Sequence, residues 1–156
     1  MAEYSANAVQ TINPGESVIF TATSVPCRRG FVRHRDESGD FLLSGWVPPR
    51  FYACPCMIDN SADYLVDFGA NIAVPDGGTV GEIAVAIAID GSTIAPSTMR
   101  ATPAAVEEYF NVAASVDIPI WRGCCQTVTV RNVSDQPILM QNANICITRP
   151  DLYVSR

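Results

Sequence analysis

The fold is decided by the stretch TVGEIAVAIAIDG, residues 79–91. Side chains of a strand point alternately to its two faces, and along Thr79–Ile89 apolar residues lie on both faces. This pattern is typical of a strand buried between two layers. Asp90-Gly91 then favours a tight turn, because glycine readily adopts a positive φ. Gly81 and Glu82 interrupt the apolar run, so it stays well below the roughly 20 residues of a membrane helix. The stretch therefore predicts a buried strand and no membrane span.

Short β-branched and aromatic runs, each closed by Gly, Pro, Asn or Asp, extend this pattern in both directions. Upstream, residues 9–12 and 17–23 are predicted to form a strand pair around the turn Asn13-Pro14-Gly15-Glu16. Residues 31–35 and 41–46 are predicted to form a hairpin around a glycine-bearing loop. The remaining predicted strands lie at residues 64–74, 110–120, 127–132 and 138–148.

Helix is scarce in this pattern. At most one short helix is predicted, near residues 102–109. There Thr102 suits the N-cap of a helix and Pro103 suits its first helical position. No internal repeat, low-complexity tract or linker divides the 156 residues. The sequence therefore predicts an all-β, two-layer antiparallel sandwich that forms a single domain over residues 1–156, with its core at about residues 6–149.

The composition excludes several classes of function. With 48% hydrophobic and 17% charged residues, the chain is expected to be ordered almost throughout. The net charge is −6, and every positive charge is an arginine. Four arginines gather within residues 28–35, but Asp36, Glu37 and Asp40 offset them, so we expect no binding to nucleic acid. The N-terminus lacks the positive start and apolar stretch of a signal peptide, so we expect synthesis in the cytosol.

Several motifs, taken in order, resemble those of a known family. They are AVQTI (8–12), PGESVIF (14–20), GDFLL (39–43), YLVDF (64–68), ANIAVP (70–75), VAIAIDG (85–91) and NANICI (142–147). The series is similar to the jelly-roll domains of tumour-necrosis-factor-like proteins. Nearer relatives in this group are the globular heads of collagen-tailed complement and spore-surface glycoproteins, and domains in bacteriophage structural proteins of Gram-positive bacteria. No collagen-like Gly-X-Y run precedes the domain, which departs from the complement and spore pattern.

The resemblance implies a jelly roll of about ten strands. It further implies a tight homotrimer that recognises partners through loops at one end or through grooves between protomers.

The apolar content independently indicates self-association. A strand that is apolar on both faces, such as Ala84–Ile89, together with further aromatic residues, gives more apolar surface than a small sandwich buries alone. Packing around a three-fold axis would cover this surface. The alternative is that the aromatic residues fill the core of a monomer. The candidates for a trimer interface are Phe51, Tyr52, Tyr109, Phe110, Trp121 and Tyr153.

Six cysteines are many for a cytosolic protein. Neither Cys54-Pro55-Cys56 nor Cys124-Cys125 has the Cys-x-x-Cys spacing of a zinc knuckle or a thioredoxin site, so no metal is predicted. In one hypothesis the thiols stay reduced and behave as small apolar groups, as suits Cys146 in its alternating strand. In the other, loops or neighbouring subunits are crosslinked after release, because adjacent cysteines do not easily bridge each other. The candidates for such crosslinks are Cys27, Cys54, Cys56, Cys124 and Cys125.

The sequence offers little catalytic chemistry. His34 is the single histidine, and no Gly-x-Ser-x-Gly motif is present. A pair of His34 with a cysteine nucleophile is conceivable, but Arg33 and Arg35 supply no orienting carboxylate, so we expect a histidine on a solvent or interface face. The acidic residues within 36–40 do not match the spacing of a calcium loop. We therefore predict no enzyme, no cofactor and no metal.

The leading hypothesis is a non-enzymatic, trimeric structural protein of a bacteriophage virion: a capsid decoration protein, a head fibre or a tail-associated adhesion module, made in the host cytoplasm. Its partners would be its own copies, other virion proteins such as the capsid, and a host-surface glycan. The alternatives are a cell- or spore-surface module that binds a glycan or receptor, a self-crosslinking fibre subunit, and, last, a thiol-dependent enzyme.

Overall fold

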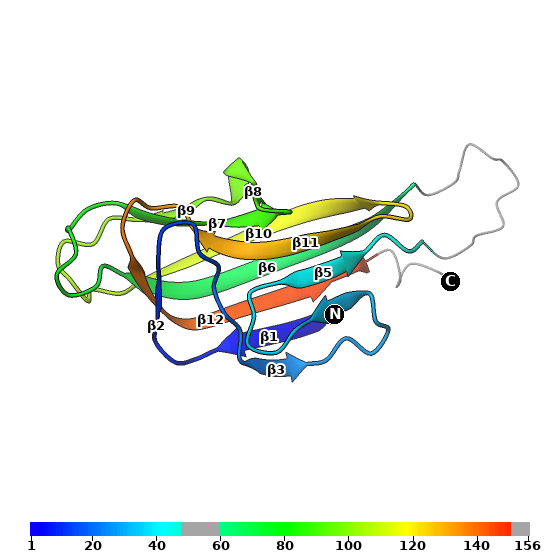
Figure 1. Cartoon of the computed structure of the whole chain (residues 1–156), viewed down its shortest axis with the longest axis horizontal. Helices are drawn as coiled ribbons and strands as arrows, with labels where there is room; N and C mark the ends of the chain where they lie inside the picture. Colours follow the sequence, from blue (N-terminus) through cyan, green and yellow to red (C-terminus); the bar gives the residue numbers. More distant parts are fainter. Residues whose placement is uncertain (48–59, 151–156) are drawn as a thin grey trace, which may run out of the picture.

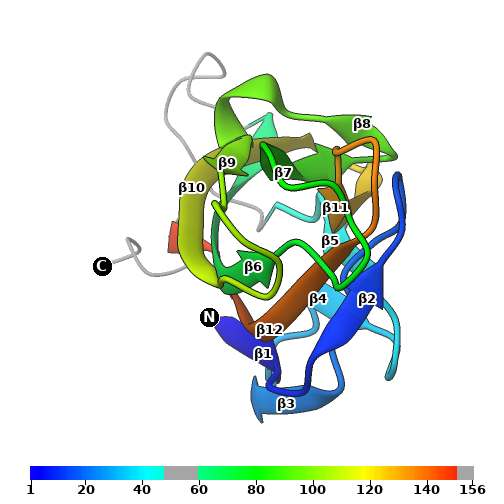
Figure 2. The ribbon, with the colours of Figure 1, turned by 90° about the vertical axis from the view of Figure 1, so that its left-hand side faces the viewer.

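The computed structural model describes residues 1–47 and 60–150, and this part of the chain forms two antiparallel sheets of six strands each, packed face to face (Figure 1). Figure 2 looks along the strands and shows the two sheets as opposing walls. The predicted all-β, two-layer sandwich is therefore confirmed. The described residues include no helix with the length and apolarity needed to cross a membrane.

The first sheet is built around the long central strands of the chain. Its strands, in spatial order, are β10 (Phe110–Trp121), β6 (Ser61–Ala73), β12 (Ile138–Thr148), β1 (Ala2–Ala6) and β3 (Ala22–Val25), with β2 (Gln10–Ile12) also paired to β12. The N-terminal strand β1 lies beside the C-terminal strand β12, from Ala2 opposite Ile147 to Ala6 opposite Ala143. The sheet thus joins the two ends of the described chain.

The second sheet contains the strand that is apolar on both faces. Its strands, in spatial order, are β4 (Val32–His34), β5 (Phe41–Ser44), β11 (Cys125–Asn132), β7 (Ile83–Ile89) and β8 (Ser92–Thr93), and β9 (Met99–Ala101) also pairs with β7. A single 3-10 turn, η2 (Ala95–Ser97), joins β8 to β9. The predicted hairpin of residues 31–35 and 41–46 is present as β4 and β5, with Val32 opposite Leu43.

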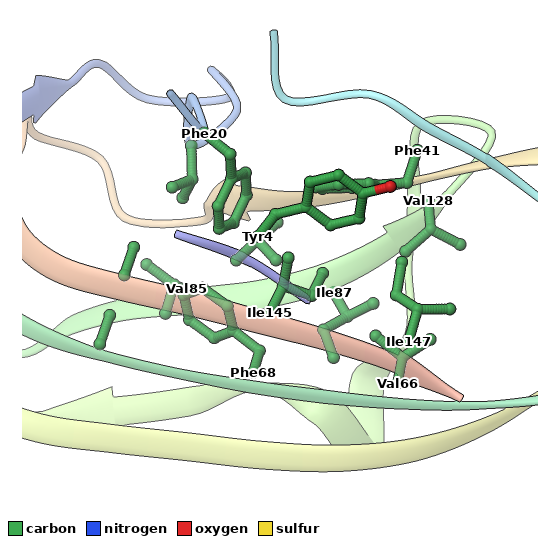
Figure 3. Packing of buried hydrophobic residues seen from close by; sticks show 14 of the residues in the cluster. Tyr4, Phe20, Phe41, Val66, Phe68, Val85, Ile87, Val128, Ile145 and Ile147 are labelled. Atoms are coloured by element: carbon green, nitrogen blue, oxygen red, sulfur yellow. The ribbon is translucent and has the colours of Figure 1, made fainter. Parts of the chain in front are cut away.

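Alternation along the strands places the core between the sheets. In β6 every second residue is buried, and β12 alternates in the same way on either side of an irregularity between Gln141 and Asn144, as expected for strands with one face toward a second layer. Figure 3 shows the side chains of Phe68 and Ile145 from the first sheet meeting those of Val85 and Ile87 from the second. This shared apolar layer holds the sheets together, because apolar surface removed from water contributes about 25 cal/mol per Å².

Strand β7 is buried on both faces, as predicted, but it begins at Ile83 and not at Thr79. Its inner residues belong to the core, and the outward-facing Ala84, Ala86 and Ala88 are 5%, 0% and 0% exposed. The register places Arg131 of β11 opposite Ala86 and Arg100 of β9 opposite Ala84, so longer side chains stand on either side of these short methyl groups. The expectation that this strand leaves apolar surface for another copy to cover is therefore wrong.

The prediction of a strand pair around residues 13–16 is also wrong. The turn forms, with Gly15 at φ 78° and the Glu16 carboxylate accepting a hydrogen bond from the Asn13 amide N–H at 3.2 Å. However, Ile12 pairs with Ile138 in the first sheet, whereas Ser17 bridges Arg131 in the second. The turn carries the chain from one sheet to the other, because the apolar residues on its two sides are buried against different walls of the same core.

Residues 102–109 form a turn and no helix. The sequence predicted at most one short helix there. The Glu108 carboxylate accepts hydrogen bonds from the N–H groups of Ala104 and Ala105, at 2.7 and 3.2 Å. Glu107 has a left-handed φ of 56° and donates its N–H to the Val74 carbonyl at 2.8 Å. A left-handed residue cannot continue a right-handed helix, so the segment reverses instead.

The stability of the sandwich should depend on the inner face of β7. Replacing the fully buried Ile87 by alanine is expected to lower the free energy of unfolding by about 2–5 kcal/mol, because the shared layer cannot collapse into the cavity that is left. Denaturant unfolding followed by circular dichroism measures the change. The exposed Val80→Ala is the matched control and should cost less than about 0.5 kcal/mol. Equal unfolding midpoints for the two variants would contradict the assignment.

Candidate functional site

His34 lies within an aromatic cluster at the β4–β5 end of the core. Its ring stacks on Phe41 with centroids 4.6 Å apart and lies 4.7 Å from the ring of Tyr4. Its Nε2 donates a hydrogen bond to the Ser38 carbonyl oxygen at 3.1 Å. These contacts give the ring a structural role in packing β4 against β1. The expectation that His34 faces solvent or an interface is therefore wrong, since Tyr4 and Phe41 leave it only partly exposed.

The four cysteines of the described residues are free thiols in different surroundings. Cys27 packs partly against the core, and Cys146 is half-buried in β12 with its Sγ 3.8 Å from the Thr148 hydroxyl. Cys124 and Cys125 are exposed where β10 turns into β11. Cys54 and Cys56 lie outside the described residues. Among residues 1–47 and 60–150, no His, Cys, Asp and Glu side chains gather in a metal-binding group.

Two of the predicted interface aromatics are exposed on a single strand. Phe110 begins β10 with 38% of its surface exposed, and Trp121 ends it with 66% exposed. They therefore do not fill a monomer's core, but a strand of this length separates them by roughly 35 Å, so they form two patches rather than one. Tyr109 is half-buried. Phe51, Tyr52 and Tyr153 lie outside the described residues.

Strand β10 is also the edge of the first sheet. It pairs with β6 from Phe110 opposite Ile72 to Trp121 opposite Ser61, and within the described residues no strand pairs with its other side. Ala114 and Val116 point inward and pack against the core, yet both remain partly exposed. The sandwich is therefore less tightly closed along the middle of this edge. We call this unpaired side of β10, with Ala114 and Val116, the β10 edge.

The outer face of the first sheet beside this edge carries small residues on β6 and β10. Gly69 lies opposite Ala113, and Ser115 lies opposite Asp67 and donates a hydrogen bond to its carboxylate at 2.5 Å. A Cβ built on Gly69 would meet nothing closer than 3.8 Å, so the surface there is open. Small side chains over several strands allow another backbone or sheet to approach closely.

A groove lies at the end of the sandwich where β5 ends and β10 turns into β11, on the right in Figure 1. Its volume is about 460 Å³. We call it the tryptophan groove; its lining residues are Ser44, Gly45, Trp46, Val47, Arg122, Gly123, Cys124 and Cys125. The sequence pattern singles out the two cysteines but not Trp46 and Arg122, because nothing in the residues beside them shows that they come together.

Backbone hydrogen bonds hold the two walls of this groove together. Gly45 donates its N–H to the Cys124 carbonyl at 2.7 Å and accepts from the Gly123 N–H at 3.1 Å. A Cβ on Gly45 would collide with the carbonyl oxygens of Trp121 and Cys124, so only glycine allows the segments to approach this closely. Beneath them, the buried Tyr64 hydroxyl donates to the Ser44 carbonyl at 2.6 Å.

Comparison with known proteins adds information on the fold. No model of a known protein family matches the sequence, and no curated protein matches it either. Solved structures do match. The Eiger tumour necrosis factor of S. frugiperda aligns with a TM-score of 0.64 and 8% identity over 95% of this chain and 90% of that chain. The globular domain of a zebrafish complement 1qA protein aligns with a TM-score of 0.57 and 10% identity over 93% and 94%.

The fold is a tumour-necrosis-factor-like jelly roll. Murine APRIL also aligns, with a TM-score of 0.50 and 11% identity over 92% of this chain and 97% of that chain. The fold that the sequence motifs implied is thereby confirmed. At identities this low, the jelly roll is shown and the function is not, because one fold supports many functions.

The exposed thiols should react first. Cys124 and Cys125 are expected to be alkylated by iodoacetamide at least about tenfold faster than the half-buried Cys146, because accessibility controls the attack. Peptide mapping by mass spectrometry after a short labelling pulse assigns the rates. The denatured protein is the control, in which the difference should vanish. Equal rates in the native protein would contradict the placement of these thiols.

Stability at alkaline pH should depend on Tyr4. Burial raises the pKa of the Tyr4 hydroxyl above its usual value of 10.0, and the nearby Cys27 thiolate raises it further. Above about pH 10 the unfolded chain therefore loses this proton before the folded chain does, and the free energy of unfolding falls as the pH rises toward the raised pKa of the folded state. No lysine titrates in this range to hide the effect.

Tyr4→Phe removes the titrating group, so its stability should decline less steeply above pH 10 than that of the unchanged protein. Thermal unfolding measured across this range gives the slopes, and the same pair measured near pH 7, where the phenol is protonated in both states, is the internal control. Parallel curves for the two proteins would show that Tyr4 does not contribute.

Proposed function

We propose that this chain is a non-enzymatic, trimeric structural module of a bacteriophage virion, which attaches to the particle through one surface and displays loops at another. The β10 edge carries this proposal. Among the described residues, the long strand β10 has no partner strand on one side. Two of its apolar residues, Ala114 and Val116, are only partly covered by the chain itself. Strand β9 and the turn η2 lie against β10, but no hydrogen-bonded ladder of the described residues covers this edge. Long unpaired edges are normally paired or covered in proteins, so a second copy is a natural occupant.

A ring of three copies fits this edge better than a two-fold pair. Direct pairing of two β10 strands would require the full ladder of backbone groups, and Pro119 has no N–H to donate. The edge can instead pack onto the outer face of the next copy, where Gly69 and Ala113 permit close approach. Such a contact joins two different surfaces, and it closes only as a ring. The jelly-roll fold and the motif resemblance support three as the number of copies.

A virion location rests on the resemblance of the motifs to bacteriophage structural proteins. The free thiols of Cys27, Cys124, Cys125 and Cys146 fit a protein made in a reducing cell interior. The exposed thiols of Cys124 and Cys125 would also allow subunits to crosslink one another once a particle reaches an oxidising medium. Mass spectrometry of purified phage particles tests the location. If the protein is absent from particles but present on spore or cell surfaces, the surface-module alternative is favoured.

The oligomeric state is the direct test of the self-association. Sedimentation velocity of the purified protein should show three times the mass of one chain. Val116→Arg should shift the population toward the monomer, because a charge on the β10 edge must be desolvated in the assembled state. Val80→Arg, at an exposed valine of a different surface, is the matched control and should remain assembled. Circular dichroism confirms that the variants are folded.

A monomer at micromolar concentration in the unchanged protein would overturn the proposal. So would a trimer that Val116→Arg leaves intact while remaining folded, since the β10 edge would then not be the contact.

A further inference from the structure

Both tryptophans of the chain are exposed at the same end of the molecule. Trp46 is 59% exposed and Trp121 is 66% exposed, whereas Phe20 and Phe41 in the core are fully buried. The chain has no other tryptophan. The two lie on segments that touch, since Gly45, next to Trp46, is packed against the Trp121 carbonyl. Large aromatic side chains gathered on a surface commonly mark a binding site.

The tryptophan groove also differs in charge from the rest of the surface. The chain carries a net charge of −6, but the groove is lined by no carboxylate of the described residues and by one cation, Arg122. Two other grooves of the described chain are acidic, since Glu82 and Asp135 line both of them. Arg122 is exposed, and its backbone N–H, not its guanidinium, makes the hydrogen bond to the Asn60 carbonyl at 2.8 Å. Its guanidinium is thus available to an anion.

We propose that the tryptophan groove binds an acidic saccharide, a sugar chain that carries carboxylate or phosphate groups. A guanidinium binds either anion through two parallel hydrogen bonds. Its planar arrangement of donors makes this geometry possible, whereas an ammonium group acts as a point charge. The indole of Trp46 offers a flat apolar face against which the C–H groups of a sugar ring pack, while the ring hydroxyls stay in water. A volume of about 460 Å³ suits one to a few sugar units.

The groove is held in shape before any ligand arrives. The Trp46 N–H donates to the Ser44 Oγ at 3.2 Å, and the Cys124 N–H donates to the Trp121 carbonyl at 3.0 Å. Together with the Gly45–Cys124 contact, these bonds fix the backbone on both sides of the groove. A site that is already ordered loses little conformational entropy when a ligand binds, so less of the binding free energy is offset. The inference adds a ligand class to the proposed virion module and does not require the trimer.

Tryptophan fluorescence gives a direct test, because both fluorophores lie beside the groove. Trigalacturonic acid serves as the carboxylate probe, an oligomer of glycerol phosphate as the phosphate probe, and maltotriose as the neutral control. At least one acidic probe should give a saturable change in emission, and about 0.5 M sodium chloride should weaken its binding several-fold through screening. Maltotriose should bind at least about tenfold more weakly than the acidic probe.

Single substitutions test whether the groove itself holds the probe. Trp46→Ala and Arg122→Gln should each weaken binding of the acidic probe by about tenfold or more. Isothermal titration calorimetry measures the affinity where a fluorophore has been removed. Arg100→Gln, at an exposed arginine that pairs with Glu82, is the matched control and should bind as the unchanged protein does.

The inference is overturned if neither acidic probe gives a saturable response, or if Arg122→Gln binds as tightly as the unchanged protein. It is also overturned if Trp46→Ala breaks the assembly, since the groove would then be filled by a second copy. Sedimentation of the same samples reports the oligomeric state, so a failure of saccharide binding is distinguished from a failure of the proposed trimer.

Discussion

Burial of one apolar layer between the two sheets is the interaction on which the rest of the molecule depends. Each sheet alone would expose a full apolar face, and the strands that supply the layer cross repeatedly from one sheet to the other, as β10, β11 and β12 do. No part of the layer can therefore form from neighbouring residues alone. Phe68 and Ile145 meet Val85 and Ile87 only when the whole sandwich closes (Figure 3). Such long-range pairing makes the core a property of the complete chain.

The same layer determines where function can be placed. Because the inner faces are committed to the core, the surfaces left for recognition are the edges of the sheets, their outer faces and the loops at the ends of the strands. The proposed trimer contact and the proposed saccharide site use different parts of this remainder. The β10 edge runs along the side of the sandwich, whereas the tryptophan groove lies at one end of it. Strand β10 connects them, since Trp121 is its last residue.

The groove shows how a rigid scaffold presents loop residues. Its two walls are far apart in the sequence, yet the hydrogen bonds of Gly45 with Cys124 and Gly123 hold one wall against the other. Trp46 and Arg122 are thereby held at the rim of a groove in an otherwise acidic molecule. The exposed thiols of Cys124 and Cys125 line the same groove. Single substitutions can therefore test the proposed assembly, ligand binding and crosslinking separately.

The two-layer architecture could be predicted from the residues alone, because alternation and turn residues act locally. Most of the buried strand predicted at 79–89, the β4–β5 hairpin and the three long C-terminal strands follow from that pattern, and the motif order implied the jelly roll. Which strands become neighbours depends on how the complete chain packs. Residues 12 and 17 flank one turn but join different sheets, β1 was not predicted, and Ala86 is covered by the chain itself. Trp46 and Arg122 line one groove for the same reason, since the pairing of distant strands brings their segments together and no pattern in the neighbouring residues indicates it.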